Sequence, residues 1–332
     1  MTPKSFSRTL FAATIVAFYA TGAAYAQNCD LKQFASIPAT LTADNRLVLD
    51  AVINDQPAKI QVDTGASFSA LNKAFATRMG MPISNSPEVI YGLTGQALTE
   101  HTRVASLRLG NKISTDAMFV LKPTGGDGAD GAPVGLFGSD YLQNYDVEID
   151  VAGGKVNLFS QDHCPGKLVY WAPEFFKTPI YYQTKTPVHR PILNIAVDGQ
   201  TMRALLDTGT GRNTMRLATA SGRLGLSPNT PGMEYVGDIM GVEGRKLPAY
   251  RHTFQSMNFG DLTLHNTTMD IVPIDTAANR NALGSHIKVG AEDEPDVFIG
   301  MSLMKQLRLV ISYSENAIYY TIAAPPKQAA GQ

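Results

Sequence analysis

The stretch that decides the fold is residues 47–67, which read LVLDAVINDQPAKIQVDTGAS. Alternating apolar residues, a polar turn at residues 54–56 and a second apolar run predict a β-hairpin whose second strand ends at Asp63. The same pattern returns at residues 192–211, which read ILNIAVDGQTMRALLDTGTG and place Asp207 after the second apolar run. The chain therefore repeats itself once, over about 140 residues.

The two copies continue to correspond downstream of the hairpins. Residues 136–138 (LFG) match residues 298–300 (FIG), and each apolar-apolar-Gly triplet precedes a short helical stretch and a closing hairpin. The closing hairpins turn at Gly153-Gly154 and at residues 314–316. The sequence predicts an all-β protein built from two homologous β-barrel lobes, with little helix.

Five segments follow from this repeat. We expect a signal peptide (1–26), an N-terminal lobe (27–164), an aromatic interlobe connector (165–188), a C-terminal lobe (189–322) and a disordered tail (323–332). The connector carries too many aromatic residues for a flexible linker and is expected to pack between or beneath the lobes. Two long loops, 122–133 and 276–295, occupy the same place in the two copies and are interpreted as insertions.

Composition and charge argue against a nucleic-acid partner. The chain of 332 residues has 28 basic and 29 acidic residues, a formal net charge of −1. Without a Lys/Arg-rich run, no nucleic-acid partner is predicted.

The N-terminus is typical of an exported protein. Lys4 and Arg8 precede an apolar run at residues 10–20 and an A-x-A site at residues 24–26. The alternative is a membrane anchor, but the run is shorter than the roughly 18 to 20 residues needed to span a bilayer. We expect a periplasmic or extracellular protein with no membrane attachment after cleavage. In that setting Cys29 and Cys164 are predicted to form a disulfide, the alternative being two buried free thiols.

The repeated Asp-Thr-Gly carries the chemistry. A lone copy is usually a turn in which Asp and Thr bond the backbone. Here Asp63-Thr64-Gly65 and Asp207-Thr208-Gly209 each follow an apolar strand. Burying a carboxylate is costly, so a fold that does so at two equivalent positions is predicted to use both.

With both motifs and both triplets, residues 40–322 resemble the pepsin and retropepsin superfamily of aspartic peptidases, specifically a bacterial-type retropepsin-like protein with two lobes in one chain. The resemblance implies that Asp63 and Asp207 meet between the lobes and activate a water molecule. It implies that Thr64 and Thr208 cross-link the two loops and that Gly65 and Gly209 permit the close turn. No metal and no cofactor are implied, and the substrate would be a peptide or an unfolded protein cut by a monomer with pseudo-two-fold lobes.

The resemblance also implies a flap, a β-hairpin over the active site. Tyr91, Gly92 and Gly95 resemble its tip in the first lobe, and the alternative there is an ordinary glycine turn. The second lobe offers Met240 and Gly241 at the corresponding place.

One departure from the family pattern bears on the two carboxyl groups. Ala66 follows the first motif and has no hydroxyl, whereas Thr210 follows the second and is expected to donate to the Asp207 carboxylate. Because hydrogen bonding to the charged form lowers a carboxyl pKa, Asp207 is predicted to be the ionised member.

Other functions have weaker support. The glycine-rich residues 126–131 open no helix and are interpreted as a plain loop, the scattered histidines disfavour a zinc peptidase, and no Gly-x-Ser-x-Gly elbow is present. Two alternatives to an active endopeptidase stay open: a catalytically silent peptide-binding or scaffold module, and a pair of lobes that needs another chain for activity.

Overall fold

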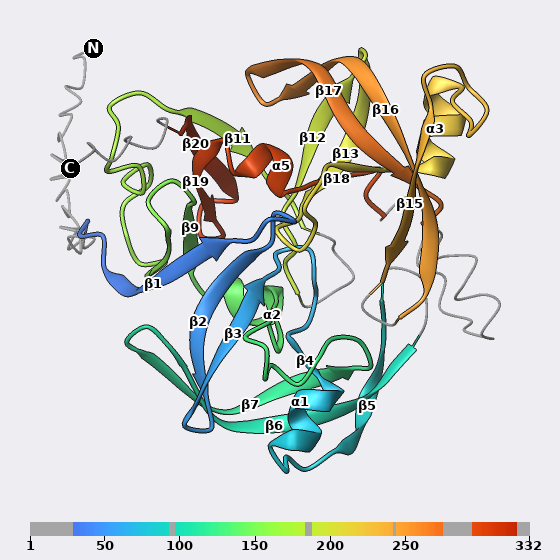
Figure 1. Cartoon of the computed structure of the whole chain (residues 1–332). Coiled ribbons are helices and arrows are strands. Elements are labelled where there is room, and N and C mark those ends of the chain that lie inside the picture. The colour runs from blue at the N-terminus through green and yellow to red at the C-terminus, as the bar shows by residue number, and fades with distance from the viewer. Residues whose placement is uncertain (1–28, 93–96, 183–187, 242–243, 275–293, 324–332) are drawn as a thin grey trace, which may run out of the picture.

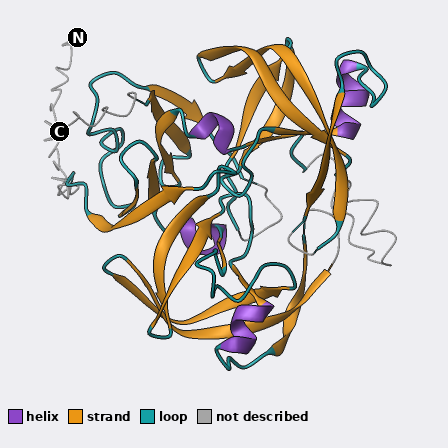
Figure 2. Cartoon of the chain, viewed as in Figure 1, coloured by secondary structure: helices purple, strands orange, loops and turns teal. Residues whose placement is uncertain are grey.

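The computed structural model describes residues 29–92, 97–182, 188–241, 244–274 and 294–323. The proposed signal peptide (1–26), nearly all of the proposed tail and of the 276–295 loop, and Gly95 lie outside these residues. Within them the protein is all-β with two lobes, as predicted, and the strands dominate the view in Figure 2.

The first lobe is a closed six-stranded barrel with the strand order β2-β3-β8-β4-β7-β6, closed by pairing of β6 with β2. The predicted hairpin forms its first two strands, with Val52 opposite Pro57. Residues that alternate inward along these strands, such as Ile53, Ile60 and Val62, are fully buried in the core. The barrel strands are β2 (Leu47–Ile53), β3 (Gln56–Val62), β4 (Ala70–Asn72), β6 (Ala97–Leu109), β7 (Lys112–Lys122) and β8 (Gly135–Phe137).

The second lobe repeats this barrel in the order β12-β13-β18-β14-β17-β16, closed by pairing of β16 with β12. Its strands are β12 (Ile192–Val197), β13 (Gln200–Leu206), β14 (Thr214–Arg216), β16 (Lys246–Phe259), β17 (Leu262–Val272) and β18 (Val297–Ile299). Outside each barrel one further strand forms a hairpin: β5 (Ser84–Tyr91) with β6, and β15 (Glu234–Met240) with β16. The lobes lie one above the other in Figure 1.

The described residues hold four short helices. The predicted helical stretches after the triplets are α2 (Ser139–Leu142) and α5 (Met301–Met304). The other two, α1 (Lys73–Arg78) and α3 (Leu217–Leu224), follow β4 and β14 and were not predicted, because segments of less than about two and a half turns show little periodicity. None of the described helices is long and apolar enough to cross a membrane.

Six further strands, in the order β11-β20-β19-β9-β10-β1, join the lobes and continue into the first barrel through the pairing of β1 with β2. The lobes meet where β9 pairs with β19, with Ile149 opposite Leu309. The strands are β1 (Gln33–Leu41), β9 (Asp146–Asp150), β10 (Lys155–Phe159), β11 (Phe176–Pro179), β19 (Leu307–Ser312) and β20 (Ala317–Ile322). The two predicted closing hairpins are therefore the centre of this interlobe sheet.

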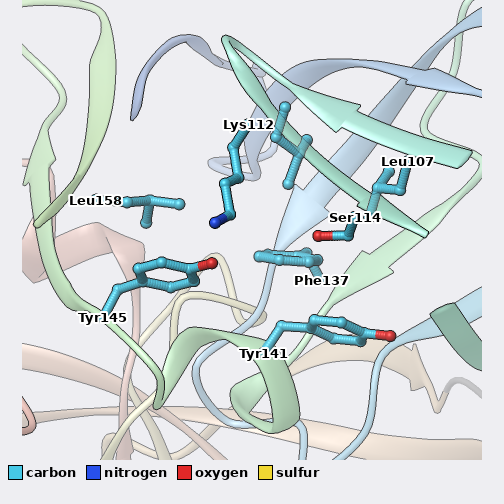
Figure 3. A pocket seen from close by; sticks show the side chains of 8 residues that line it. Leu107, Lys112, Ser114, Phe137, Tyr141, Tyr145 and Leu158 are labelled. Atoms are coloured by element: carbon cyan, nitrogen blue, oxygen red, sulfur yellow. The ribbon is translucent and has the colours of Figure 1, made fainter. Parts of the chain in front are cut away.

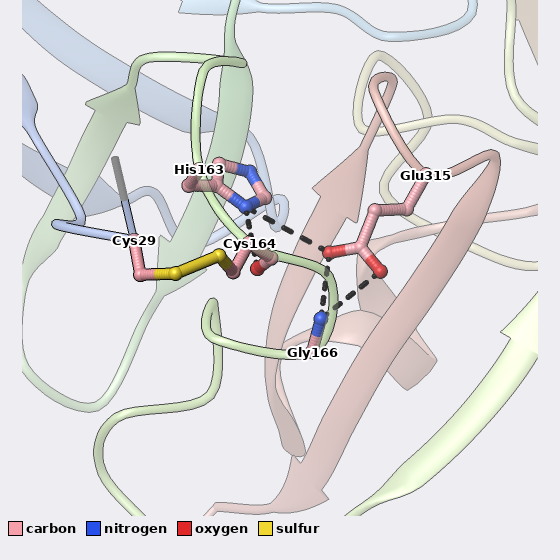
Figure 4. The surroundings of a disulfide bond; sticks show 5 residues. All are labelled: Cys29, His163, Cys164, Gly166 and Glu315. Carbon is pink, nitrogen blue, oxygen red and sulfur yellow. Dashed lines mark hydrogen bonds and ion pairs between the residues drawn. A yellow bond between two sulfur atoms is a disulfide. The ribbon is translucent and has the colours of Figure 1, made fainter. Parts of the chain in front are cut away.

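The segment between the lobes packs against this sheet. Leu168 and Val169 are buried against Phe159 and Tyr319, and β11 adds an edge strand to β20. The predicted disulfide between Cys29 and Cys164 is present at the start of this segment and closes a loop of 135 residues (Figure 4).

Candidate active site

Asp63 and Asp207 each follow the last residue of a barrel strand. β3 runs parallel to β8 and β13 parallel to β18, so the strand ends lie beside the two triplets. The backbone N–H of Asp63 donates to the Phe137 carbonyl at 3.0 Å, and that of Asp207 donates to the Ile299 carbonyl at 2.9 Å. The apolar-apolar-Gly triplets therefore fix the backbone of both aspartates.

The two Asp-Thr-Gly loops are cross-linked by Thr64 and Thr208, both fully buried. The Thr64 hydroxyl donates to the Leu206 carbonyl at 2.6 Å and accepts the Thr208 N–H at 3.1 Å. The Thr208 hydroxyl donates to the Val62 carbonyl at 2.9 Å and accepts the Thr64 N–H at 3.0 Å. Each hydroxyl therefore binds the backbone of the opposite lobe, in a nearly symmetric network.

Glycine is required at Gly65 and Gly209 because each backbone packs directly on the opposite carboxyl group. A Cβ built on Gly65 would overlap the Asp207 carboxyl atoms, and one built on Gly209 would overlap those of Asp63. Any larger residue would push the carboxyl groups apart.

The carboxyl groups of Asp63 and Asp207 lie together, each against the glycine that belongs to the other motif, and each affects the pKa of the other. Oδ1 of Asp63 also accepts two backbone N–H groups, from Gly65 at 3.1 Å and Ala66 at 2.9 Å. Oδ1 of Asp207 accepts one, from Gly209 at 2.8 Å. The pair is therefore in contact, but its two members have different surroundings.

These surroundings contradict the premise on which Asp207 was predicted to be the ionised member, a hydrogen bond from the Thr210 hydroxyl. The Thr210 hydroxyl donates to the Arg212 carbonyl at 3.2 Å, and no bond from it to Asp207 is seen in the described residues. Burial raises the pKa of both carboxyl groups, and the charge of Asp63 raises the pKa of Asp207 further, well above its usual value. The extra backbone N–H from Ala66 favours the charged form of Asp63 over that of Asp207.

Two polar residues that the sequence reasoning missed also reach these loops from the opposite lobe. Gln61 Nε2 donates to the Gly209 carbonyl at 3.0 Å, and Arg190 Nη1 donates to the Gly65 carbonyl at 3.3 Å. The available signal was the repeat itself, since Arg46 precedes Asp63 by the same number of residues as Arg190 precedes Asp207.

The four described flap residues lie at the ends of the strands that form the two outer hairpins. Tyr91 ends β5 opposite Ala97, Gly92 follows it, and both are half-buried. Met240 ends β15 and is 60% exposed, and the Gly241 N–H bonds the Arg245 carbonyl in the turn. A Cβ built on Gly244, in the same turn, would lie 3.5 Å from a side-chain carbon of Thr124 in the first lobe. The second hairpin therefore reaches across to the other lobe.

Other parts of the described chain hold two cavities, neither of them lined by Asp63 or Asp207; the larger, of about 310 Å³, lies in the second lobe beside Arg212, His265 and Ser302. No group of three or more His, Cys, Asp or Glu residues is placed to hold a metal ion in the ranges that the structure describes. A cavity of about 10 Å³ in the first lobe has room for about one water molecule, with Lys112 pointing between Phe137 and Tyr145 (Figure 3). That cavity is too small for a peptide.

Comparison with known families agrees with this geometry. Residues 49–144 match a gag-polyprotein aspartyl protease family, and residues 193–303 match a second family, aspartyl protease. Both are retropepsin-like, and the chain belongs to this superfamily as a protein with two such lobes in one polypeptide. A search of curated proteins found no match for the chain.

Proposed function

We propose that the protein is an aspartic endopeptidase whose one active site is the Asp63–Asp207 pair. The observation that carries this proposal is the close placement of two carboxyl groups, one from each lobe, on loops tied together by Thr64 and Thr208. Two such groups in contact hold one proton between them at moderate pH. A site that only binds peptides needs neither the shared proton nor the cross-linked loops.

The unequal surroundings assign the chemical roles. Ionised Asp63 removes a proton from a water molecule, and the water oxygen attacks the scissile carbonyl carbon. Protonated Asp207 donates its proton to the carbonyl oxygen, which gives a neutral tetrahedral intermediate. When the C–N bond breaks, the proton on Asp63 passes to the leaving nitrogen, and Asp207 recovers a proton from the intermediate. The pair ends with the same single proton, and no metal or cofactor takes part.

The substrate and setting follow from the same features. The flap hairpins suit an extended peptide or an unfolded protein segment, and both aspartates come from one chain, so we propose a monomeric enzyme. The disulfide suits a protein exported to the periplasm or beyond.

The central test is replacement of the two aspartates. Purified protein, Asp63→Asn, Asp207→Asn and the double variant are incubated with unfolded casein from pH 3 to 8, with and without pepstatin. Because the carboxyl groups act as a unit, all three variants should be almost equally inactive, with grossly non-additive losses. Asp55→Asn, at an exposed turn, is the control and should keep full activity.

The variants should remain folded. A carboxyl pKa raised in the folded state means that its stabilising contribution, present below the unfolded pKa of about 4, is lost as pH rises through the folded value. Each Asn variant removes that loss, so near neutral pH it should unfold at a urea concentration no lower than the parent protein. Substantial activity in either single variant would refute the shared site. Peptide binding without cleavage in the parent protein would favour the silent module, and activity only in a larger species on gel filtration would indicate a second chain.

A further inference from the structure

One charged residue outside the two motifs, Arg190, acts on both carboxyl groups. It lies at the start of the second lobe, two residues before β12, and its guanidinium bonds the Gly65 carbonyl in the first lobe at 3.3 Å. Gly65 is also the residue whose N–H binds the Asp63 carboxylate. Arg190 therefore contacts the loop that orients Asp63.

The backbone beside Arg190 belongs to the same hydrogen-bond network. The Leu206 N–H donates to the Pro191 carbonyl at 2.9 Å, and the Leu206 carbonyl accepts the Thr64 hydroxyl at 2.6 Å. Arg190 thus extends from a segment that is bonded to the end of β13, immediately before Asp207. Its position is coupled to both lobes.

The matching contact on the other side of the site is neutral. The Gly209 carbonyl accepts an amide N–H from Gln61 at 3.0 Å, whereas the Gly65 carbonyl accepts from a guanidinium. Arg46, the repeat counterpart of Arg190, instead pairs with Asp44 at 2.8 Å and has an exposed side chain. The two lobes are therefore alike in hydrogen bonding but unlike in charge.

We propose that Arg190 is a positioning residue for the Asp63–Asp207 pair. Arg190 holds the Asp63 loop from the opposite lobe and supplies the cation that favours one negative charge on the pair. The effect of Arg190 on catalysis rests on the proposed function, whereas its effect on the titration of the two carboxyl groups does not.

The charges around the pair support this role. Within the described residues, each carboxyl group is acted on by the other carboxyl group and by the positive charge of Arg190. Asp63 also accepts the backbone N–H groups of Gly65 and Ala66, and Asp207 accepts that of Gly209. Burial raises the pKa of both carboxyl groups, and the positive charge of Arg190 opposes that rise in both. Without the cation, a single negative charge on the pair should form only at higher pH.

The test compares pH profiles of kcat/KM for the parent protein, Arg190→Gln and Arg190→Lys, with Gln61→Leu and Arg46→Gln as controls. Arg190→Gln removes the charge, so both limbs of the profile should move to higher pH, and Arg190→Lys should move them less. Gln61→Leu removes the uncharged hydrogen bond to the Gly209 carbonyl and introduces leucine, the residue that Leu205 provides at the same position of the second copy. It should lower the plateau of kcat/KM without moving the limbs of the pH profile. Arg46→Gln should leave the profile unchanged.

A second readout keeps this proposal separate from the proposed function. Titration of the Asp63 and Asp207 carboxyl carbons by ¹³C NMR, in parent protein and Arg190→Gln, needs no substrate and should show both transitions moved to higher pH. Circular dichroism checks that each variant is folded, and Arg190→Lys serves if Arg190→Gln does not fold. Unmoved carboxyl transitions in a folded variant, or a lower plateau with unmoved limbs, would overturn the electrostatic role. A protein that cleaves nothing but shows the moved transitions would refute the peptidase and retain the role of Arg190.

Discussion

The threonine network allows a quantitative prediction for the contact between the lobes. Thr64→Val keeps the side-chain volume and removes one hydroxyl, which makes two hydrogen bonds to the opposite lobe. The change leaves the Leu206 carbonyl and the Thr208 N–H without their partners, in residues that are fully buried. Each buried unsatisfied group costs about 1 to 3 kcal/mol, so with two such groups we expect the free energy of unfolding to fall by about 2 to 6 kcal/mol.

The second threonine and an exposed one complete the design. Thr208→Val leaves the Val62 carbonyl and the Thr64 N–H unpaired and should cost about the same, because the network is nearly symmetric. The double variant should lose less than the sum, since the loops can relax once the first bonds are gone. Thr253→Val, on the exposed side of β16, bonds Thr268 through its side chain and should change stability by less than about 0.5 kcal/mol.

Urea denaturation followed by tryptophan fluorescence and circular dichroism measures these differences, and kcat/KM on casein should fall together with stability. If Thr64→Val were as stable as Thr253→Val, the hydroxyls would not carry the contact between the loops, and the reasoning would fail.

Two further predictions concern the Cys29–Cys164 disulfide and its neighbour His163, both drawn in Figure 4. Replacing both Cys29 and Cys164 by Ser should lower the free energy of unfolding by about 4 to 5 kcal/mol, because the disulfide closes a loop of 135 residues. Urea denaturation with and without reductant measures this loss. Two free thiols in protein from an oxidising compartment would contradict the prediction. The buried imidazole of His163 lies 2.6 Å from the Asp146 carboxylate. Burial is the largest single influence and opposes its charge, but the bonds to Asp146 and to the Cys164 carbonyl and the charges of Asp146 and Glu315 together outweigh burial and raise the pKa of His163. The stability that His163 supplies should therefore be complete below its unfolded pKa of about 6.5 and be lost as pH rises through the higher folded value, as measured by the difference in unfolding free energy from His163→Gln between pH 5 and 9. A pH-independent difference would show that the imidazole does not change charge in this range.

The sequence by itself determined the features that are local or repeated. An apolar hairpin ending in Asp-Thr-Gly occurs twice, each time with an apolar-apolar-Gly triplet downstream. This repeat predicts two barrels, because strand alternation and turn chemistry are encoded within a few neighbouring residues. The same repetition identified Asp63 and Asp207, and two cysteines allow only one intramolecular pairing. Thr64 and Thr208 could be assigned as cross-links through the family resemblance.

Only the tertiary structure decided how the two halves differ. The assignment of charge to Asp63 depends on the Ala66 backbone N–H, which every residue except proline has, so no side-chain pattern indicates it. Arg190 and Gln61 bond loops that are more than 100 residues away in the chain. Neither the repeat position that Arg190 shares with Arg46 nor the polar character of Gln61 indicates which partner each side chain reaches. The pairing of β9 with β19 is likewise a contact between lobes. Sequence periodicity reports which face of an element is buried, whereas the charge and hydrogen bonds of a site depend on which distant elements are brought against that face.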